Sequence, residues 1–260
     1  MTTVALLYHD VVRNGAFDSS GFTSPDADIY KLDADLFRRH VRSITETASN
    51  VLVTVDDGGV SASETIAPIL EEHGLSGYFF IPTNWIGRSG FLSREQIREL
   101  RRRGHLIGSH SCSHPERISH CTWQQVCDEW KRSADTLFDI LSEPIQMASV
   151  PGGFYNRSVA KAAGLAGIRT LFTSDPTTKV YKVENCVVVG RFMIQRSTST
   201  ELATALARGD ILPRIKQSLL WSAKKGFKTV GGTTWLRFRK WAIARMWIRR
   251  AQSSSSRSSI

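Results

Sequence analysis

Seven short runs of β-branched, aromatic and other apolar residues are spread over the first 190 residues of the chain. None of them alternates apolar with polar residues in the way that a strand with one solvent-exposed face does. Strands covered on both faces, as in a parallel sheet flanked by helices, account better for such runs. The runs are residues 4–8, 51–55, 77–81, 105–109, 146–150, 168–173 and 186–190.

Helical segments lie between these runs, as the crossover connections of a parallel sheet require. Asp33 is a candidate cap, and the pairs Ser61 with Glu64 and Ser93 with Gln96 have the spacing of a capping box. The expected helices are residues 33–47, 61–73, 93–103, 122–141 and 156–165. This order predicts an α/β fold, and seven strands suit an incomplete barrel. A doubly wound open sheet is the alternative, but no glycine-rich nucleotide-binding loop follows the first run.

The positive charge of the chain is concentrated towards its C-terminal end. The net charge is +10, but residues 202–260 contain thirteen Lys or Arg and one acid, whereas residues 1–201 contain 21 basic and 23 acidic residues. The two parts therefore need separate explanations. We expect a barrel over residues 1–200, a basic helical extension over residues 201–252 and a Ser-rich disordered tail over residues 253–260.

The extension mixes tryptophan with arginine, and three explanations for it stay open. A helix packed on the outside of the barrel, with extended arginine stems, comes first. Contact of residues 211–250 with an anionic membrane surface comes second, because Trp and Arg both suit the lipid headgroup region. A nucleic-acid surface is the least expected of the three.

We find no signal for export or for a membrane span in the sequence. The first ten residues contain no basic segment and no small-residue cleavage site, and charge interrupts every apolar run before the ~20 residues that span a bilayer. The four cysteines form no CxxC pair, so free thiols are expected. We expect a cytoplasmic protein, peripheral on the cytoplasmic membrane face where the extension contacts lipid.

Ionisable residues follow several of the predicted strands at the point where each strand ends. In a parallel barrel these ends share one rim, where the reacting groups lie. The residues are His9, Asp56, Asp57, His110, His114, Asp175 and Arg191. Two adjacent carboxylates repel each other unless a cation lies nearby, and two imidazoles four residues apart, with one Asp, can hold a metal ion. A capped turn and a pair of surface histidines explain each motif alone, but together the motifs favour a metal site.

Four short motifs lie in order along the predicted barrel. They are residues 8–11 (YHDV), 54–58 (TVDDG), 110–114 (HSCSH) and 151–156 (PGGFYN). They resemble the Y-H-x-[IV] start, the T-F-D-D-G motif, the H-[ST]-x-x-H motif and the third motif of the NodB-like polysaccharide deacetylases, carbohydrate esterase family 4. The resemblance covers about residues 4–195 and implies a distorted (β/α)7 barrel.

The resemblance also implies metal-assisted removal of an N-acetyl group from an amino sugar of a cell-surface glycan or its precursor. The ligands of a divalent metal, usually zinc, correspond to Asp57, His110 and His114. Asp56 corresponds to the general base that takes a proton from water. We assign three residues of the third motif to substrate binding: Pro151, Gly152 and Tyr155.

Two positions depart from the family pattern. Ser149 stands where the family has the Arg that orients the base, and no late Leu-x-His motif supplies the general acid, because the last histidine is His120. His9 is our first choice for the acid, since it is the spare imidazole on the predicted rim. Arg191 can replace the missing Arg or bind an acidic substrate group, and Asp175 can contact substrate or an Arg.

We therefore expect a hydrolase of linear amide C–N bonds that is atypical because the usual catalytic His and Arg are missing. The alternative is a catalytically impaired relative that binds metal and glycan and recruits partners at the membrane. The retained Asp56 favours the enzyme, because a pure binding protein needs no base beside the metal.

Overall fold

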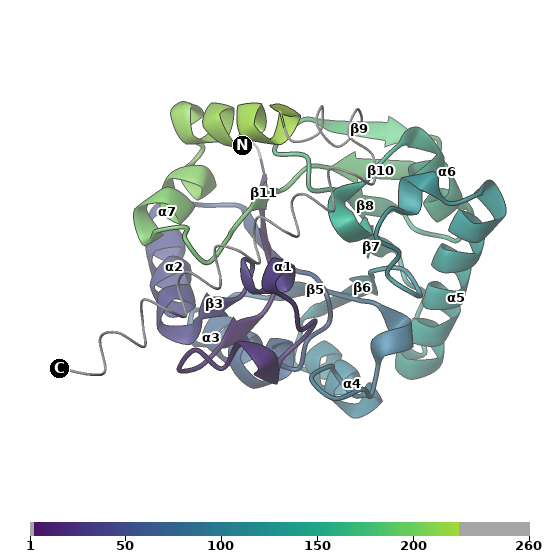
Figure 1. Ribbon diagram of the computed structural model, residues 1–260, viewed down its shortest axis with the longest axis horizontal. Helices are drawn as coiled ribbons and strands as arrows, with labels where there is room; N and C mark the ends of the chain where they lie inside the picture. The colour runs from purple at the N-terminus through teal and green to yellow at the C-terminus, as the bar shows by residue number, and fades with distance from the viewer. Residues whose placement is uncertain (1–2, 224–260) are drawn as a thin grey trace.

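The computed structural model describes residues 3–223, which form a curled sheet with helices around its outer side (Figure 1). Within this range the main sheet has the strand order β11-β1-β4-β5-β6-β7-β8-β10-β9, and its pairs are parallel except that of β10 with β9. A separate parallel pair joins β2 (Val11–Val12) to β3 (Leu32–Asp33). The strands of the main sheet are β1 (Val4–Tyr8), β4 (Val51–Val55), β5 (Gly77–Ile81), β6 (Leu106–Ser109), β7 (Met147–Ser149), β8 (Thr170–Phe172), β9 (Val180–Val183), β10 (Cys186–Val189) and β11 (Phe192–Met193).

The seven apolar runs of the sequence coincide with seven of these strands, and the predicted barrel class is confirmed. β1 is buried along its whole length, as expected of a strand covered on both faces. One short stretch of chain connects the two sides of the curled sheet. β10 pairs with β8, and β11, three residues further on, pairs with β1. Arg191 lies between β10 and β11, where the chain passes from one edge to the other.

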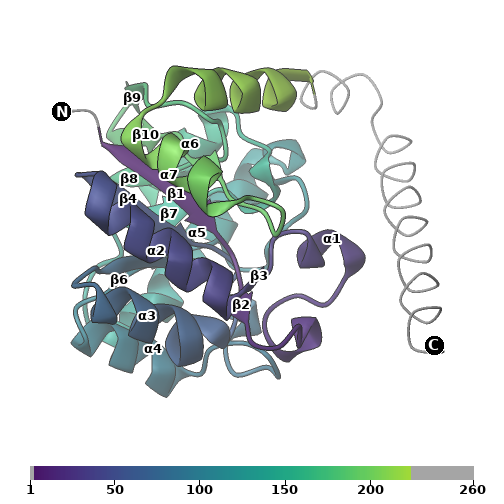
Figure 2. The ribbon, with the colours of Figure 1, turned by 90° about the vertical axis from the view of Figure 1, so that its left-hand side faces the viewer.

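The helices form the outer wall, and Figure 2 shows α2, α3 and α4 against the outside of the sheet. α1 lies away from this wall, on the segment between β2 and β3 (Figure 2). The helices are α1 (Pro25–Asp28), α2 (Ala34–Thr47), α3 (Ala67–Glu72), α4 (Arg94–Arg102), α5 (Trp123–Leu141), α6 (Arg157–Leu165), α7 (Thr200–Arg208) and a last one over residues 211–223.

The predicted capping box at the start of α4 is confirmed: the side chains of Ser93 and Gln96 each bond the other residue's backbone N–H. The box predicted for Ser61 and Glu64 is wrong. The Ser61 side chain makes no cap and instead donates a hydrogen bond to the Asp10 carboxylate. This helix begins as a π-helical turn over Ala62–Ile66, just before Pro68, which has no N–H for a regular helical bond.

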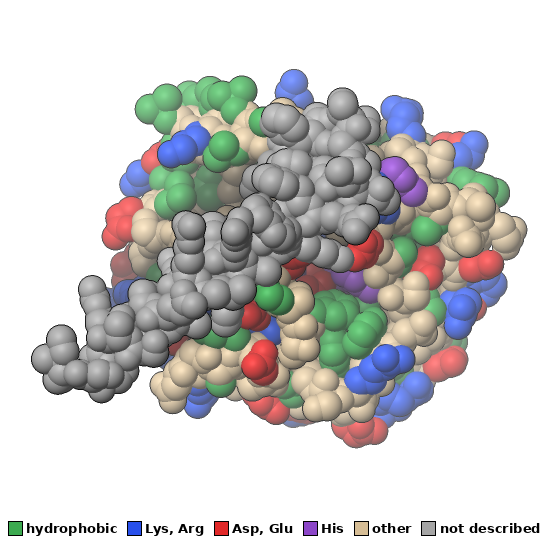
Figure 3. Space-filling view, in the orientation of Figure 1, with side chains coloured by type: hydrophobic (Ala, Val, Ile, Leu, Met, Phe, Trp, Pro, Cys, Tyr) green, Lys and Arg blue, Asp and Glu red, His purple; other side chains and the backbone are tan. Residues whose placement is uncertain are grey.

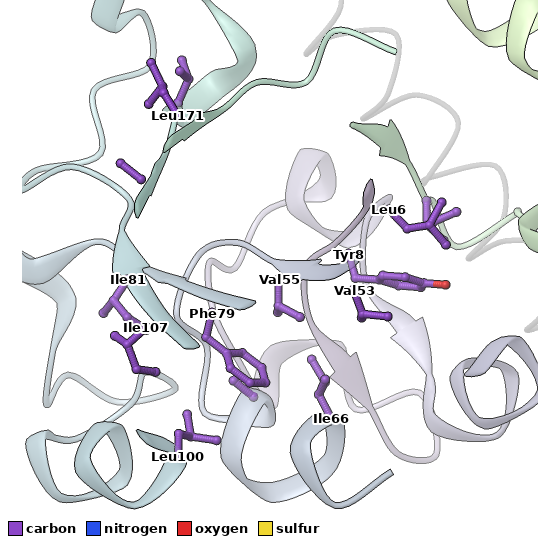
Figure 4. Close-up of a cluster of buried hydrophobic side chains, with 14 of the residues drawn as sticks. Leu6, Tyr8, Val53, Val55, Ile66, Phe79, Ile81, Leu100, Ile107 and Leu171 are labelled. Atoms are coloured by element: carbon purple, nitrogen blue, oxygen red, sulfur yellow. The ribbon is translucent and has the colours of Figure 1, made fainter. Parts of the chain in front are cut away.

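A large apolar core fills the space between the sheet and the helices. Figure 4 shows part of it, in which Val53, Phe79 and Ile107 from three neighbouring strands lie with Ile66 and Leu100 from the helical layer. All five side chains are buried. The curled sheet therefore has its outer face fixed by apolar packing, which leaves the inner face for the site.

The inner face of the sheet carries a smaller apolar cluster around Ala5, Phe80 and Phe172. Gly108 makes room for it, because a Cβ there would lie 2.6 Å from the Phe80 ring. Side chains alternate between the faces of a strand, so every second residue along these strands points to the same inner side. At the carboxyl ends this alternation reaches His9, Asp56, His110, Ser149 and Arg191.

The structure moves the predicted boundary between barrel and extension. Residues 201–208 were expected to belong to the extension, but α7 packs against α2 and β1. Its residues Ala203, Leu206 and Ala207 are buried in the main core. The helix ends at Gly209, whose φ of 101° suits glycine, so the extension begins after this residue. The predictions for residues 224–252 and 253–260 lie outside the described residues.

Candidate metal and catalytic site

A cavity of about 1060 Å³ opens where the carboxyl ends of the strands meet, and its size is that of a small-molecule site. Four of the ionisable residues expected at this rim line it: His9, Asp56, Asp57 and His114. Much of its wall is aromatic, from Phe22, Tyr30, Trp85, Phe91, Phe154 and Trp221. Figure 3 shows histidine and acidic side chains close together near the centre of this face.

Asp57, His110 and His114 come together as predicted. Asp57 Oδ1 lies 3.4 Å from Nε2 of each histidine, and one ligand atom from each of the three residues lies within 4.8 Å of the others. Ligands at Zn–N and Zn–O distances near 2.1 Å in a tetrahedral arrangement are separated by about 3.4 Å. The donor set, one carboxylate and two imidazoles, therefore fits a divalent ion such as zinc.

The backbone at the ligands is held in an unusual conformation. Asp57 and His114 have φ angles of 73° and 59°, in the left-handed region that residues with a Cβ seldom adopt. At Asp57 the chain turns out of β4, which brings both adjacent carboxylates to one side. At His114 the backbone N–H donates to the Ser111 hydroxyl, and Glu129 on α5 accepts from the N–H groups of Cys112 and Ser113.

The tautomer of His110 is set by its partner on the next strand. Its Nδ1 lies 3.0 Å from the Ser149 carbonyl oxygen, which can only accept, so Nδ1 carries the proton. Nε2 is then free to bind a metal and faces Asp57. His114 is oriented differently, because its ring packs on Phe22 at a centroid distance of 4.9 Å.

Asp56 is held by Arg191 in a two-point ion pair. Nη1 and Nη2 of Arg191 lie 2.7 and 2.8 Å from the two carboxylate oxygens of Asp56, and the Ser149 hydroxyl donates to Oδ2 at 2.9 Å. Asp56 is 4% exposed and Arg191 is fully buried. The position where the family has its Arg is therefore occupied by a serine that contacts the same carboxylate, while the guanidinium comes from the link between β10 and β11.

The assignment of Arg191 to substrate binding is not supported. Nε donates to the Thr173 carbonyl, Nη1 to Thr54 and Asp56, and Nη2 to Asp56 and Ser149. These five contacts use all five N–H donors of the guanidinium, so none is left for an acidic substrate group. Of the two roles expected for Arg191, the geometry supports the one in which it replaces the missing Arg.

The pKa values in the site follow from this pairing. Burial by itself would raise the pKa of Asp56, but Arg191 and His110 hold it below its usual range. Burial opposes ionisation of Asp57 too, yet the neighbouring imidazoles of His110 and His114 keep its pKa well below the usual value. Burial would lower the pKa of His110, and the two carboxylates raise it. The site therefore attracts positive charge.

His9 lies on the cavity wall, beside the ligands and the base. Its ring packs against Tyr30 at a centroid distance of 4.9 Å. Its Nδ1 is buried and has no hydrogen-bond partner among residues 3–223. The residue therefore lines the cavity, and its buried Nδ1 is left unpartnered within the described part of the chain.

The third motif lines the cavity with Gly152, Gly153 and Phe154, of which only Gly152 was predicted. Gly152 lines it and has a φ of 63°, and a Cβ there would lie 2.4 Å from the Glu116 carbonyl oxygen. Pro151 is buried and does not line the cavity. Tyr155 packs against the main core instead, so its assignment to direct substrate contact is not supported. The next residue, Asn156, caps α6.

Asp175 is not among the residues that line the cavity, so its expected contact with substrate is not supported. Its carboxylate accepts a 2.8 Å hydrogen bond from the Trp221 indole N–H. Trp221 lies on the helix over residues 211–223 and lines the cavity beside Gly153, where a Cβ would be 3.0 Å from the indole. Trp221 was not predicted as a site residue. The glycine pair of the third motif was the one local signal that another part of the chain packs closely there.

Comparisons with known proteins agree with this geometry. Residues 43–171 match the family model described as polysaccharide deacetylase. YxkH of Bacillus subtilis (strain 168) is 30% identical over 126 residues, which are 48% of this chain and 45% of YxkH. The peptidoglycan-N-acetylglucosamine deacetylase PgdA of Listeria monocytogenes is 25% identical over 154 residues, 59% of this chain and 31% of PgdA. The chain thus spans less than half the length of these relatives.

Solved structures share the fold at low sequence identity. The Streptococcus pyogenes deacetylase PplD superposes with a TM-score of 0.66 at 18% identity, over 81% of this chain and 99% of PplD. IcaB from Ammonifex degensii superposes with a TM-score of 0.62 at 19% identity, over 80% of this chain and 97% of IcaB. Given the family-model match, these relatives and this fold, the chain belongs to the NodB-like polysaccharide deacetylases, carbohydrate esterase family 4.

Proposed function

We propose that the protein is a metal-dependent deacetylase that removes an N-acetyl group from an amino sugar of a cell-surface glycan or its precursor. The observation that carries this proposal is the position of Asp56. An ionised carboxylate, fixed by Arg191, lies at the cavity beside the cluster Asp57, His110 and His114. A carboxylate in that place can accept a proton from an attacking water.

Zinc is the ion we propose for Asp57, His110 and His114, because nitrogen and oxygen donors at these separations suit it. A divalent ion at these residues supplies Lewis acidity, which polarises a carbonyl group and acidifies water. The three side chains also leave room on the cavity side for water and substrate, since Asp57 and His114 line the open space.

The proton transfers fall to two residues of the chain. Asp56 takes a proton, and the Arg191 guanidinium keeps it ionised and fixes its two oxygens. Cleavage of the C–N bond also needs a proton for the leaving amine. We assign this role to His9, which lines the same cavity and has an unpartnered Nδ1 among the described residues. The aromatic wall would orient the sugar ring.

The test is acetate release from N-acetylated substrates with metal added or chelated. Chitin oligomers, peptidoglycan fragments and single N-acetyl sugars form the substrate panel. We expect release from at least one of them, loss with chelator, and loss in Asp56→Asn with metal content retained. A metal-loaded protein that binds these glycans but releases no acetate from any of them would instead support the impaired relative that recruits partners. The expected cytoplasmic location stays a prediction.

A further inference from the structure

The helix over residues 211–223 reverses the usual arrangement of a surface helix. Such a helix normally directs its apolar stripe to the core. Here the side facing the barrel makes polar contacts: Arg214 donates to the Leu206 carbonyl, Gln217 to the Met193 carbonyl and Trp221 to Asp175. Residues 214, 217 and 221 follow the spacing i, i+3, i+7, which places them on one face.

The opposite side of this helix is aliphatic and exposed. Leu212 and Leu219 are 81% and 66% exposed, and Ile211 and Ile215 are also exposed. These four residues, which we call the outer face, lie within about a third of the helix circumference. Figure 3 shows hydrophobic side chains gathered at the upper left, where Figure 1 places this helix. The polar bonds on the inner side hold the outer face towards solvent.

The sequence around the outer face is strongly basic. Residues 211–260 contain twelve Lys or Arg and no Asp or Glu. Lys216 is an exposed member of this set on the helix itself. Trp235, Trp241 and Trp247 follow in the sequence, interspersed with arginines. The exposed aliphatic side chains of the outer face therefore belong to a sequence with a high density of positive charge.

We propose that the outer face binds the surface of an anionic lipid bilayer. Aliphatic side chains enter the boundary between headgroups and acyl chains, and each nearby basic residue adds about 1 kcal/mol of attraction to anionic lipid. A second copy of the chain is a poorer partner, because the basic segments of the two copies would repel each other. Nucleic acid would bind the basic residues through its phosphates, but the aliphatic side chains of the outer face would stay exposed to water.

The same helix forms part of the cavity wall, because Trp221 on its inner side lines the cavity. Bilayer contact would therefore place the rim of the cavity beside the lipid surface. The attachment is peripheral: within residues 3–223, none of the helices has the length and apolar content to cross a bilayer. This proposal does not depend on catalysis, so it can be tested on a protein without substrate.

The experiment measures binding of the full chain to vesicles of phosphatidylcholine, with and without phosphatidylglycerol, by co-sedimentation at low and high salt. We expect binding to the anionic vesicles that weakens with salt. The double variant Leu212→Ser/Leu219→Ser keeps every charge and should bind about tenfold more weakly or worse. The control Leu165→Ser/Val180→Ser removes two other exposed aliphatic side chains, 69% and 59% exposed, and should bind like the wild type.

Equal binding of the wild type and the Leu212/Leu219 variant would overturn the proposal, as would absence of binding to anionic vesicles. Two further measurements address other occupants. A dimer that forms without vesicles and is lost in the same variant would make the outer face a dimer interface. Displacement of the protein from anionic vesicles by an equal charge of duplex DNA would assign the basic segment to nucleic acid.

Discussion

The guanidinium of Arg191 binds both carboxylate oxygens of Asp56 although 135 residues separate the two positions. The pair exists because the chain crosses from one barrel edge to the other at residue 191, above Phe80 and Phe172 on the inner face. Ser149, at the family's Arg position, contributes a hydroxyl to the same network. The Asp56 carboxylate is thus fixed from the link between β10 and β11, and not from the family's Arg position on β7.

Arg191→Lys should lower kcat/KM on a responsive substrate by roughly tenfold to a hundredfold, because one ammonium cannot bond both oxygens of Asp56. Arg191→Ala should in addition lower the free energy of unfolding by about 3–5 kcal/mol, since it leaves a buried carboxylate unpaired. Kinetics and urea denaturation measure the two effects. The exchange variant Ser149→Arg/Arg191→Ser should be more active than Arg191→Ser. If it is not, Arg191 does not take the place of the family's Arg.

Asp57→Ala and His114→Ala should each abolish stoichiometric binding of a divalent ion, because each removes one of three ligands. Elemental analysis of purified protein measures the content. His120→Ala is the control, since this exposed histidine lies outside the ligand set, and it should retain one ion per chain. Full metal content in both ligand variants would show that the ligands are assigned wrongly.

His9→Gln should reduce turnover by roughly a hundredfold while leaving metal content unchanged, because it removes the proposed proton donor but no ligand. Acetate release and elemental analysis on the same preparation separate the two effects. Tyr30→Leu, which removes the ring packed on His9, serves as a comparison and should reduce turnover less. If His9→Gln turns over at the wild-type rate, the proton donor is another group.

Gly152→Ala should destabilise the fold more than Gly167→Ala, although both glycines have a positive φ. At Gly167 a Cβ meets nothing within 4 Å, so the expected loss is about 1 kcal/mol from backbone strain alone. At Gly152 the Cβ would also meet the Glu116 carbonyl at 2.4 Å, which raises the expected loss to about 2–4 kcal/mol. Urea denaturation measures both, and equal losses would rule out the steric explanation.

His40 should make stability fall between pH 7.5 and pH 5. Burial lowers its pKa to about 4 in the folded protein, against 6.5 for the ordinary side chain. The unfolded state therefore binds the proton first as the pH drops, and folding loses about 2 kcal/mol over this interval. The neutral ring donates from Nε2 to the Thr198 carbonyl and accepts from the Tyr8 hydroxyl at Nδ1.

Urea denaturation at the two pH values measures this effect, and His40→Gln should remove about 2 kcal/mol of the difference. The substitution keeps a polar side chain at the contact between α2 and the segment before α7. An unchanged pH dependence in His40→Gln would place the titrating group elsewhere, for example at His105, whose pKa burial also lowers.

Local patterns in the sequence determined much of this protein. Strand formation, helix capping and the spacing of metal ligands all depend on residues that are close in the sequence. The apolar runs, the Ser93 cap and the spacing of His110 and His114 are therefore visible in short segments of the chain. For that reason the seven barrel strands and the ligand cluster Asp57, His110 and His114 could be predicted. β9 was not predicted, because it has only four residues and Lys182 interrupts its apolar run.

Long-range packing alone decided the rest. Ser61 bonds Asp10 instead of capping a helix, Arg191 reaches Asp56, and Trp221 reaches Asp175 across 46 residues. Several polar groups of the chain could form a hydrogen bond with each of these side chains. The residues next to it in the sequence do not determine which of those groups it contacts. Only the curling of the sheet, which brings its two edges and the carboxyl ends of its strands to one rim, determines which partner lies within reach.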